Sequence, residues 1–181
     1  MRSTIANLVG SITPYDQIEA DQIAATLVWI ASGAPLCRVV KPDVPPRHLV
    51  SYAVLVDLDQ RHVLLVDHRK AGLWLPTGGH VEPDEHPAAT ARREIREELA
   101  IDAAFVLNDP LFLTVTRTVG TTAGHTDVSL WYVLRGDATH TPTFDADEFH
   151  AVRWFPFDAV PFEHADPHMG RFVAKLASVT R

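Results

Sequence analysis

The sequence predicts an α/β sandwich, in which helices cover a sheet of strands. Strand-like apolar runs lie on both sides of a central helix-forming segment, and an amphipathic helix follows the last of these runs. The chain has 181 residues, of which 46% are hydrophobic. That length and composition are enough for one domain with a full core.

The chain begins with a helical lead. From residue 5 to residue 12, apolar residues recur at i, i+3, i+4 and i+7, the spacing of one helix face. Thr13-Pro14 predicts the start of a second helix, with the threonine as N-cap and the proline at the first position, and Gly33 ends it. We expect residues 1–46 to form a helical N-terminal extension packed on a main domain of residues 47–181.

The main domain opens on two strand-like runs, and the short Asp59-Gln60 link between them suggests a hairpin. Three further apolar runs follow the central helix. The predicted strands are residues 49–58, 61–67, 111–118, 128–134 and 151–157. Apolar residues at 169, 172, 173 and 176 then predict a terminal amphipathic helix.

The central helix carries the most informative charges. It begins at Pro87, because a proline suits the first turn, where its missing N–H would be unpaired anyway. Within it, Glu94, Glu97 and Glu98 are related as i, i+3 and i+4, so they share one helix face. These carboxylates repel each other, and a hard divalent cation such as Mg²⁺ or Mn²⁺ relieves the repulsion. The competing interpretation is an exposed, solvated charged helix.

The segment from Gly79 to Ile101 resembles the Nudix box. That box has a glycine, a glutamate six residues on, and then Arg-Glu-apolar-x-Glu-Glu-x-Gly-apolar. The matching positions are Gly79, Glu85, Arg93, Glu94, Ile95, Glu97, Glu98, Ala100 and Ile101. Only Ala100 departs from the pattern. The glycine in its correct place favours the metal-site interpretation of the helix over the solvated one.

The resemblance implies the Nudix fold, a mixed sheet between helices. It also implies a Nudix-type pyrophosphohydrolase, which hydrolyses a phosphoanhydride bond in a nucleoside diphosphate derivative by metal-activated water. Mg²⁺ would be held by Glu94, Glu97, Glu98 and the carbonyl of Gly79, with Mn²⁺ as a substitute. A salt bridge between Glu85 and Arg93 would support the loop before the helix.

A second match lies outside the box. Glu148 stands six residues before a tryptophan, as a late glutamate does in the family, where it often completes the metal site or acts as a base. Asp145 and Asp147 compete for this role, and the alternative is an acidic loop before a strand. The candidate catalytic residues are therefore Glu94, Glu97, Glu98 and Glu148. Since neighbouring carboxylates titrate as a group, the sequence does not choose the base among Glu94, Glu98 and Glu148.

Ala100 replaces the family glycine that follows the helix. Helix C-caps often require a positive φ angle, at which alanine costs about 1 kcal/mol more than glycine. We expect a local adjustment there, without loss of the site.

Several histidines lie near the motif, or in a loop that could face it. His80, His86 and His125 are more simply explained as surface or packed residues than as substrate contacts. Transition-metal binding by these three residues is not expected, because they are not spaced as His-x-x-x-His. Trp74 and Trp131 are better explained by core packing than by stacking on a base.

The composition excludes some partners. A net charge of −7 argues against a nucleic-acid polymer, whereas a small nucleotide is compatible because bound metal would reverse the local sign of charge. The single cysteine, Cys37, allows no disulfide within the chain, and we expect a cytoplasmic protein. No apolar run approaches the roughly 18 residues of a membrane span. The sequence leaves a homodimer open.

Two other classes of protein share the implied fold. A catalytically silent Nudix module would sense a nucleotide and regulate a partner, but such modules commonly lose the box glutamates that this chain keeps. An enzyme resembling isopentenyl-diphosphate isomerase would need a catalytic cysteine, and Cys37 lies before the first predicted strand, a poor place for that role. The sequence does not choose among nucleoside triphosphates, ADP-ribose, dinucleoside polyphosphates and sugar nucleotides as substrates.

Overall fold

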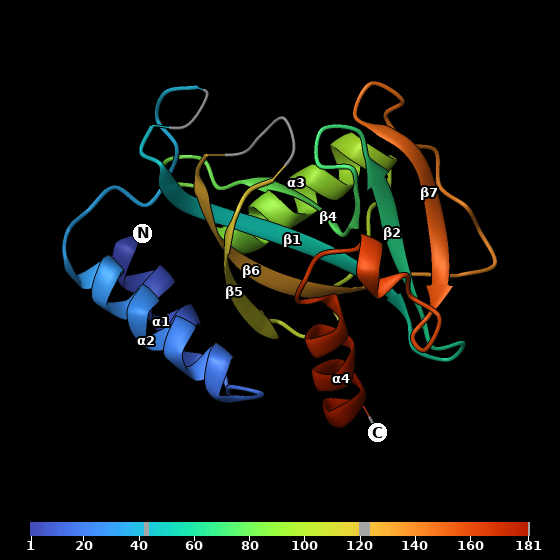
Figure 1. Ribbon diagram of the computed structural model, residues 1–181, viewed down its shortest axis with the longest axis horizontal. Coiled ribbons are helices and arrows are strands. Elements are labelled where there is room, and N and C mark those ends of the chain that lie inside the picture. Colours follow the sequence, from blue (N-terminus) through green and yellow to red (C-terminus); the bar gives the residue numbers. More distant parts are fainter. Residues whose placement is uncertain (42–43, 120–123, 181) are drawn as a thin grey trace.

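In the computed structural model, which describes residues 1–41, 44–119 and 124–180, seven strands form one mixed sheet between helices (Figure 1). The helices are α1 (Arg2–Ser11), α2 (Gln17–Ala31), α3 (Pro87–Leu99), a short 3-10 helix η2 (Phe162–His164) and α4 (Met169–Val179). The strands are β1 (Arg47–Asp57), β2 (His62–His68), β3 (Leu73–Leu75), β4 (Thr77–His80), β5 (Phe112–Arg117), β6 (Thr126–Arg135) and β7 (Phe149–Pro156). These elements confirm the predicted α/β class.

Strand β1 is the centre of the sheet. It pairs in parallel with β6 along most of its length, from Arg47 opposite Thr126 to Val56 opposite Arg135. On its other side it pairs antiparallel with β4 and, further along, with β2. The sheet order is β3-β2-β1-β6-β5, and β7 lies on β2. One parallel pair among antiparallel ones makes the sheet mixed, as the resemblance implied.

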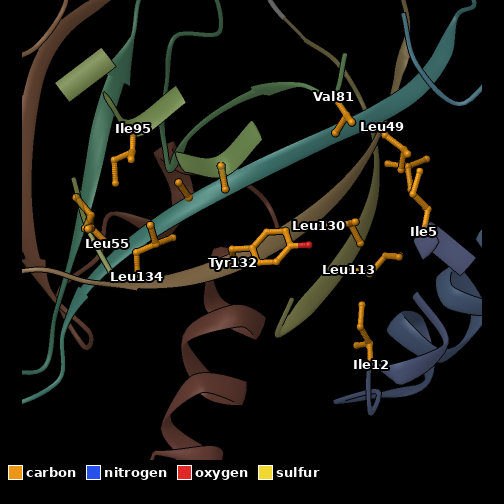
Figure 2. Packing of buried hydrophobic residues seen from close by; sticks show 14 of the residues in the cluster. Ile5, Ile12, Leu49, Leu55, Val81, Ile95, Leu113, Leu130, Tyr132 and Leu134 are labelled. Carbon is orange, nitrogen blue, oxygen red and sulfur yellow. The ribbon is translucent and has the colours of Figure 1, made fainter. Parts of the chain in front are cut away.

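The sheet separates two hydrophobic cores, and β1 contributes to both because successive side chains of a strand point to opposite faces. Leu49 and Leu55 join the core that α1, α2 and α3 cover, part of which is drawn in Figure 2. Val54 and Val56 join the core beneath α4. Both faces are therefore covered, which explains why β1 and β6 read as nearly continuous apolar runs.

The N-terminal extension forms two helices, but the predicted start of the second helix at Thr13-Pro14 was wrong. Helix α2 begins at Gln17, and its N-cap is Asp16, whose carboxylate accepts the N–H of Glu19 at 2.9 Å. Arg171 of α4 donates two hydrogen bonds to the same carboxylate, of 2.6 and 2.7 Å. This bond to Arg171 is the main cause that lowers the pKa of Asp16 to about 2. The contact joins residues far apart in the sequence, so the local pattern did not reveal it.

Helix α2 is held between β5 and α4 through one buried carboxylate. Glu19 is fully buried, and its Oε1 accepts the backbone N–H of Leu113 in β5 at 3.1 Å. Lys175 of α4 donates to both carboxylate oxygens of Glu19, at 2.8 and 3.0 Å. One turn further along α2, Gln22 donates to the carbonyl of Val115 at 3.3 Å. The extension therefore packs on the sheet and on the last helix at once.

Two of the tryptophans pack within the fold. Trp131 is fully buried and stacks on Phe172 of α4, while Trp74 meets Phe155 edge to face. Core packing explains both tryptophans, as expected. Among the residues that the structure describes, no helix is both long and apolar enough to cross a membrane.

Helix α3 ends at the residue where the sequence departs from the Nudix box. Ala100 has φ 55° and ψ 30°, a left-handed conformation, and its N–H donates to the carbonyl of Arg96 at 3.1 Å. The helix thus keeps the geometry that glycine favours, with an alanine in place, so the local adjustment expected from the sequence does not occur. We predict that Ala100→Gly raises the free energy of unfolding by up to about 1 kcal/mol, because Ala100 is exposed and loses no packing.

Urea unfolding of the purified chain measures this change, and α2 offers a matched control. Ala25 is exposed in the interior of a regular helix, where the same substitution should lower stability by about 1 kcal/mol. Opposite signs for the two variants are the expected result. If Ala100→Gly lowered stability as Ala25→Gly does, the left-handed strain at residue 100 would be refuted.

Candidate active site

The segment before α3 is organised by hydrogen bonds close to the helix start. Pro87 is the first helical residue, as predicted, and the side chain of the N-cap His86 accepts the N–H of Ala88 at 3.2 Å. His86 therefore caps the helix, which is a structural task. This start fixes the direction in which the later glutamates of α3 point.

Strand β4 passes directly under the glutamates of α3. The backbone N–H of Gly78 donates to Oε2 of Glu98 at 3.2 Å. A Cβ atom placed on Gly79 would overlap the carboxylate of Glu94. Glycine is thus required at position 79 by close approach, because any side chain would displace Glu94. The carbonyl of Gly79 and the carboxylates of the glutamates, which the sequence predicts as metal ligands, thus lie on the neighbouring elements β4 and α3.

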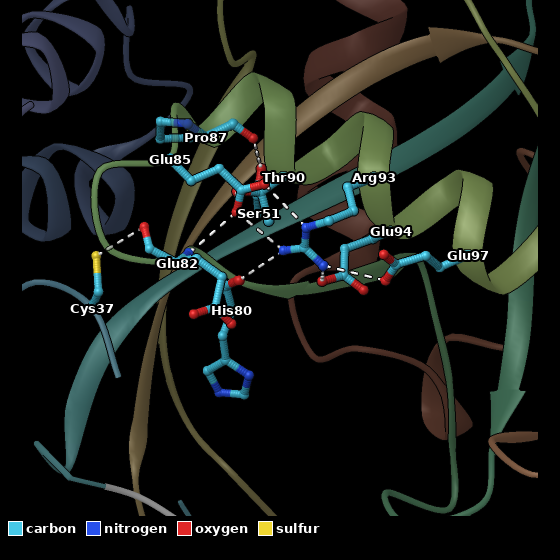
Figure 3. Close-up of polar contacts among 10 residues, drawn as sticks. All are labelled: Cys37, Ser51, His80, Glu82, Glu85, Pro87, Thr90, Arg93, Glu94 and Glu97. Carbon is cyan, nitrogen blue, oxygen red and sulfur yellow. Dashed lines mark hydrogen bonds and ion pairs between the residues drawn. The ribbon is translucent and has the colours of Figure 1, made fainter. Parts of the chain in front are cut away.

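Arg93 connects the loop to the helix (Figure 3). Its guanidinium donates to both oxygens of Glu85, at 3.0 and 3.1 Å, and to the carbonyl of His80 at 3.3 Å. The same oxygen Oε2 of Glu85 accepts the hydroxyl of Thr90 at 2.7 Å. Burial opposes ionisation of Glu85, yet these bonds from Arg93 and Thr90 leave its pKa below the ordinary value. The loop and the helix are therefore joined by an ion pair that is charged at neutral pH.

Arg93 also meets two glutamates of the predicted metal site. Its Nη1 lies 2.6 Å from Oε1 of Glu94 and 3.3 Å from Oε2 of Glu97. The Glu94 side chain is mostly buried, whereas that of Glu97 is 60% exposed. One arginine thus offsets part of the negative charge on this helix face.

Glu98 is the most strongly perturbed carboxyl of the site. It is buried, and this desolvation, followed by repulsion from Glu94 and Glu148, raises its pKa to about 9. Burial also raises the pKa of Glu94, although Arg93 opposes the shift. Buried carboxyls whose pKa values are raised in this way are typical of functional sites.

Glu148 joins the same group from the other side. It lies just before β7 and is half-buried, and its charge contributes to the raised pKa of both Glu94 and Glu98. Asp145 and Asp147, the competing residues, are exposed, and the carboxylate of Asp145 accepts the N–H of Asp147 at 2.8 Å. The N–H of Asp145 donates to the carbonyl of Glu98 at 3.0 Å, which ties this loop to the end of α3. The fold thus gathers four glutamates from two distant segments.

The donor set fits a hard divalent cation. It combines carboxylate oxygens with a backbone carbonyl on a strand that approaches them closely, and Mg²⁺ and Mn²⁺ prefer such oxygen ligands. A cation here would favour the charged form of Glu98, which burial and then repulsion from Glu94 and Glu148 disfavour.

The structure contains a second polar cluster, which was not predicted from the sequence. His48, His80, His125 and Asp127 place one nitrogen or oxygen atom each within 4.8 Å of one another. The expectation against a transition metal rested on spacing along the sequence, and the sheet brings the histidines together regardless of that spacing. The one local signal was His125-x-Asp127, because residues two apart on a strand share a face. The partners on β1 and β4 depend on strand register.

The family described as NUDIX domain matches residues 46–176. A CTP pyrophosphohydrolase of Escherichia coli (strain K12) is 35% identical over 117 residues, which make up 60% of this chain and 77% of that protein. A MutT NUDIX hydrolase from Burkholderia pseudomallei has a similar structure, with a TM-score of 0.58 and 22% identity over 72% of this chain and 98% of its own. The E. coli dihydroneopterin triphosphate pyrophosphohydrolase has a TM-score of 0.56 and 17% identity over 78% and 99% of the two chains.

The fold and the site place the protein among enzymes of α/β architecture that act on acid anhydrides. The family match covers well over half of the chain, and the relative from E. coli shares 35% of aligned residues. The chain therefore belongs to the Nudix family, and it is a Nudix-type pyrophosphohydrolase. The two solved structures share too little sequence to show more than the fold.

Proposed function

We propose that the protein hydrolyses a phosphoanhydride bond of a nucleoside triphosphate, with Mg²⁺ held by Glu94, Glu97, Glu98 and the carbonyl of Gly79. The observation that carries the proposal is the buried Glu98, crowded by Glu94 and Glu148 against the glycine strand β4. Mn²⁺ is the expected substitute, because it accepts the same oxygen ligands.

The bound cation would lower the pKa of a water molecule and neutralise charge on the phosphate oxygens. The residues of the chain supply the rest. A carboxylate accepts a proton from the water molecule while the water oxygen attacks phosphorus. The bond between this phosphorus and the bridging oxygen breaks, and the bridging oxygen leaves with the departing phosphate group. Glu94, Glu98 and Glu148 are the candidates for this base, and the charge of Glu148 contributes to the raised pKa of both Glu94 and Glu98.

Two positioning residues would hold the loop in place. Glu85 and Arg93 join the start of the segment to α3, and Arg93 also fixes the carboxylate of Glu94. We further propose that residues 47–181 are the catalytic domain and that residues 1–46 are an extension packed on it. The contacts of Glu19 with β5 and α4 support this division.

The choice of a triphosphate rests on the relative with 35% identity. That E. coli protein is called a CTP pyrophosphohydrolase, a name that describes a nucleoside triphosphate as the substrate. ADP-ribose, dinucleoside polyphosphates and sugar nucleotides form the comparison set.

The test is a substrate panel with the purified full chain, in Mg²⁺, in Mn²⁺ and in a chelator. We expect release of pyrophosphate from at least one nucleoside triphosphate, and we expect the chelator to abolish it. Turnover that persists in the chelator would refute the metal assignment. Nucleotide binding without turnover of any compound would instead identify a silent sensing module.

A further inference from the structure

The second cluster draws three of its ligand atoms from strands β1, β4 and β6, and the fourth from His125, which directly precedes β6. Nε2 of His48 lies 3.4 Å from Oδ1 of Asp127, and Nε2 of His125 lies 3.3 Å from the same oxygen. The imidazole ring centroid of His48 lies 4.5 Å from that of His80 and 4.8 Å from that of His125. Three imidazoles and one carboxylate thus converge on one point.

Strand register explains why these side chains meet. His48 in β1 is the parallel partner of Asp127 in β6, and His80 in β4 is the partner of Val50, two residues beyond His48. Residues two apart, and residues paired across strands, point to the same face of a sheet. The cluster is therefore a product of the pairing of β1 with both β4 and β6.

The cluster faces away from the glutamates of α3. Gly79 approaches Glu94, and the next residue of β4, His80, points to the opposite face because strand side chains alternate. Figure 3 shows the His80 ring directed away from Glu94 and Glu97. Two groups of potential ligands thus lie on the two faces of the same strand.

Several ligand atoms are buried without a hydrogen bond, which in native proteins calls for an explanation. Within the described part of the chain this holds for Nε2 of His48, Nε2 of His80 and Oδ1 of Asp127. His48 is fully buried, and its Nδ1 must donate to the carbonyl of Pro45 at 2.9 Å, because a carbonyl only accepts. That bond leaves the lone pair of Nε2 directed at the cluster, which is how outer hydrogen bonds prepare histidine ligands of metals.

A simple ion pair does not account for the arrangement. One carboxylate would balance one imidazolium, and a second protonated ring at these distances would be repelled. A cation bound to three neutral imidazoles and one carboxylate would give a partner to the buried atoms of His48, His80 and Asp127 that have no hydrogen bond. Three nitrogens and one oxygen form the donor set of Zn²⁺ and related ions, whereas Mg²⁺ prefers oxygen ligands alone.

We propose that His48, His80, His125 and Asp127 form a transition-metal site of the Zn²⁺ type, on the sheet face opposite the α3 glutamates. The site would link β1, β4 and β6. It would hold β4 from the sheet face opposite Glu94. The proposal concerns residues other than those of the proposed catalytic site, so each can fail without the other.

The test is a titration of the metal-free full chain with Co²⁺, read by visible absorption. Four-coordinate Co²⁺ with nitrogen ligands absorbs intensely, whereas Co²⁺ in an all-oxygen, six-coordinate site is nearly colourless. We expect one intensely absorbing Co²⁺ per chain, displaced by Zn²⁺ and unaffected by excess Mg²⁺. Zn²⁺ should also raise the unfolding temperature, because it binds the folded chain.

Variants assign the absorption to the cluster. His80→Gln and Asp127→Asn should each weaken Co²⁺ binding at least about 100-fold, more than the loss of an outer partner causes. The surface pair Asp137 and His140, whose side chains are 58% and 82% exposed, supplies the matched controls Asp137→Asn and His140→Gln, which should change nothing. Glu98→Gln should also leave the absorption intact.

Three results would overturn the proposal. The first is the absence of intense absorption at saturating Co²⁺. The second is absorption that persists in both cluster variants. The third is absorption lost in Glu98→Gln, which would place the ion at α3. His80 is only half-buried, so we expect His80→Gln to fold, and its unfolding midpoint in the metal-free state checks this.

Discussion

Replacing Glu98 by glutamine is expected to lower turnover by about 10²–10⁴-fold, the usual contribution of a positioned acid or base. Glutamine keeps an oxygen that can accept the N–H of Gly78, but it cannot take a proton from water and is a poor ligand for a hard cation. Glu97→Gln should likewise lower turnover by orders of magnitude. Initial rates on the substrate found by the panel measure both effects.

The stability of the Glu98→Gln variant separates chemistry from folding. Burial and neighbouring carboxylates raise the pKa of Glu98 to about 9, so in the metal-free protein it is mostly protonated at neutral pH, and glutamine imitates that form. Because the pKa is raised, ionisation of Glu98 disfavours the folded state increasingly as the pH rises from about 4.5 to about 9. The unfolding midpoint of the variant at neutral pH should therefore not fall below that of the wild type.

Glu163→Gln is the matched control for these two variants. Glu163 is exposed in η2 and belongs to neither cluster, so its substitution should leave rate and stability unchanged. Full activity in both Glu97→Gln and Glu98→Gln would remove these glutamates from the site. If the rate fell only in proportion to the fraction of folded protein, the two glutamates would have a structural role and not a catalytic one.

The second large effect concerns stability. Lys175→Met should lower the free energy of unfolding by about 3–5 kcal/mol, the cost of leaving one member of a buried ion pair without its partner. Glu19 would remain fully buried beneath α4, with the ammonium group of Lys175 gone. Chemical unfolding followed by circular dichroism measures this change.

Two further variants make the Lys175 result interpretable. Adding Glu19→Gln to Lys175→Met should recover part of the loss, because the amide removes the stranded charge and keeps an acceptor for Leu113. Arg96→Met breaks an exposed pair with Asp102, whose side chains are 61% and 76% exposed, and should cost less than about 1 kcal/mol. If Lys175→Met lowered the free energy of unfolding no more than Arg96→Met does, the Glu19–Lys175 pair would contribute no more to stability than an exposed ion pair.

The parts that the sequence predicted well are governed by local rules. Pro87 marked the start of α3, the apolar runs marked the main strands, and the spacing of Glu94, Glu97 and Glu98 put them on one helix face. Each of these features depends on residues a few positions apart.

The features that escaped prediction depend on distant contacts. Asp16 displaces Thr13 as the helix cap because Arg171 holds it from α4. The cluster around His48 depends on the pairing of β1 with β4 and β6, which no spacing along the chain records. The roles of the glutamates stay predictions until the variants are measured, although the structure brings Glu148 to the same group.

The position of α2 beside β5 affects how readily one chain could associate with another. Strand β5 ends the sheet path, and an exposed edge offers backbone groups to other molecules as a template for aggregation. Glu19 and Gln22 occupy the N–H of Leu113 and the carbonyl of Val115, two of those groups. A shortened protein that began at β1 would retain the α3 glutamates, but the edge of β5 would be exposed and could pair with other chains. We therefore expect the extension to oppose association of chains through β5, although it contributes none of the α3 glutamates.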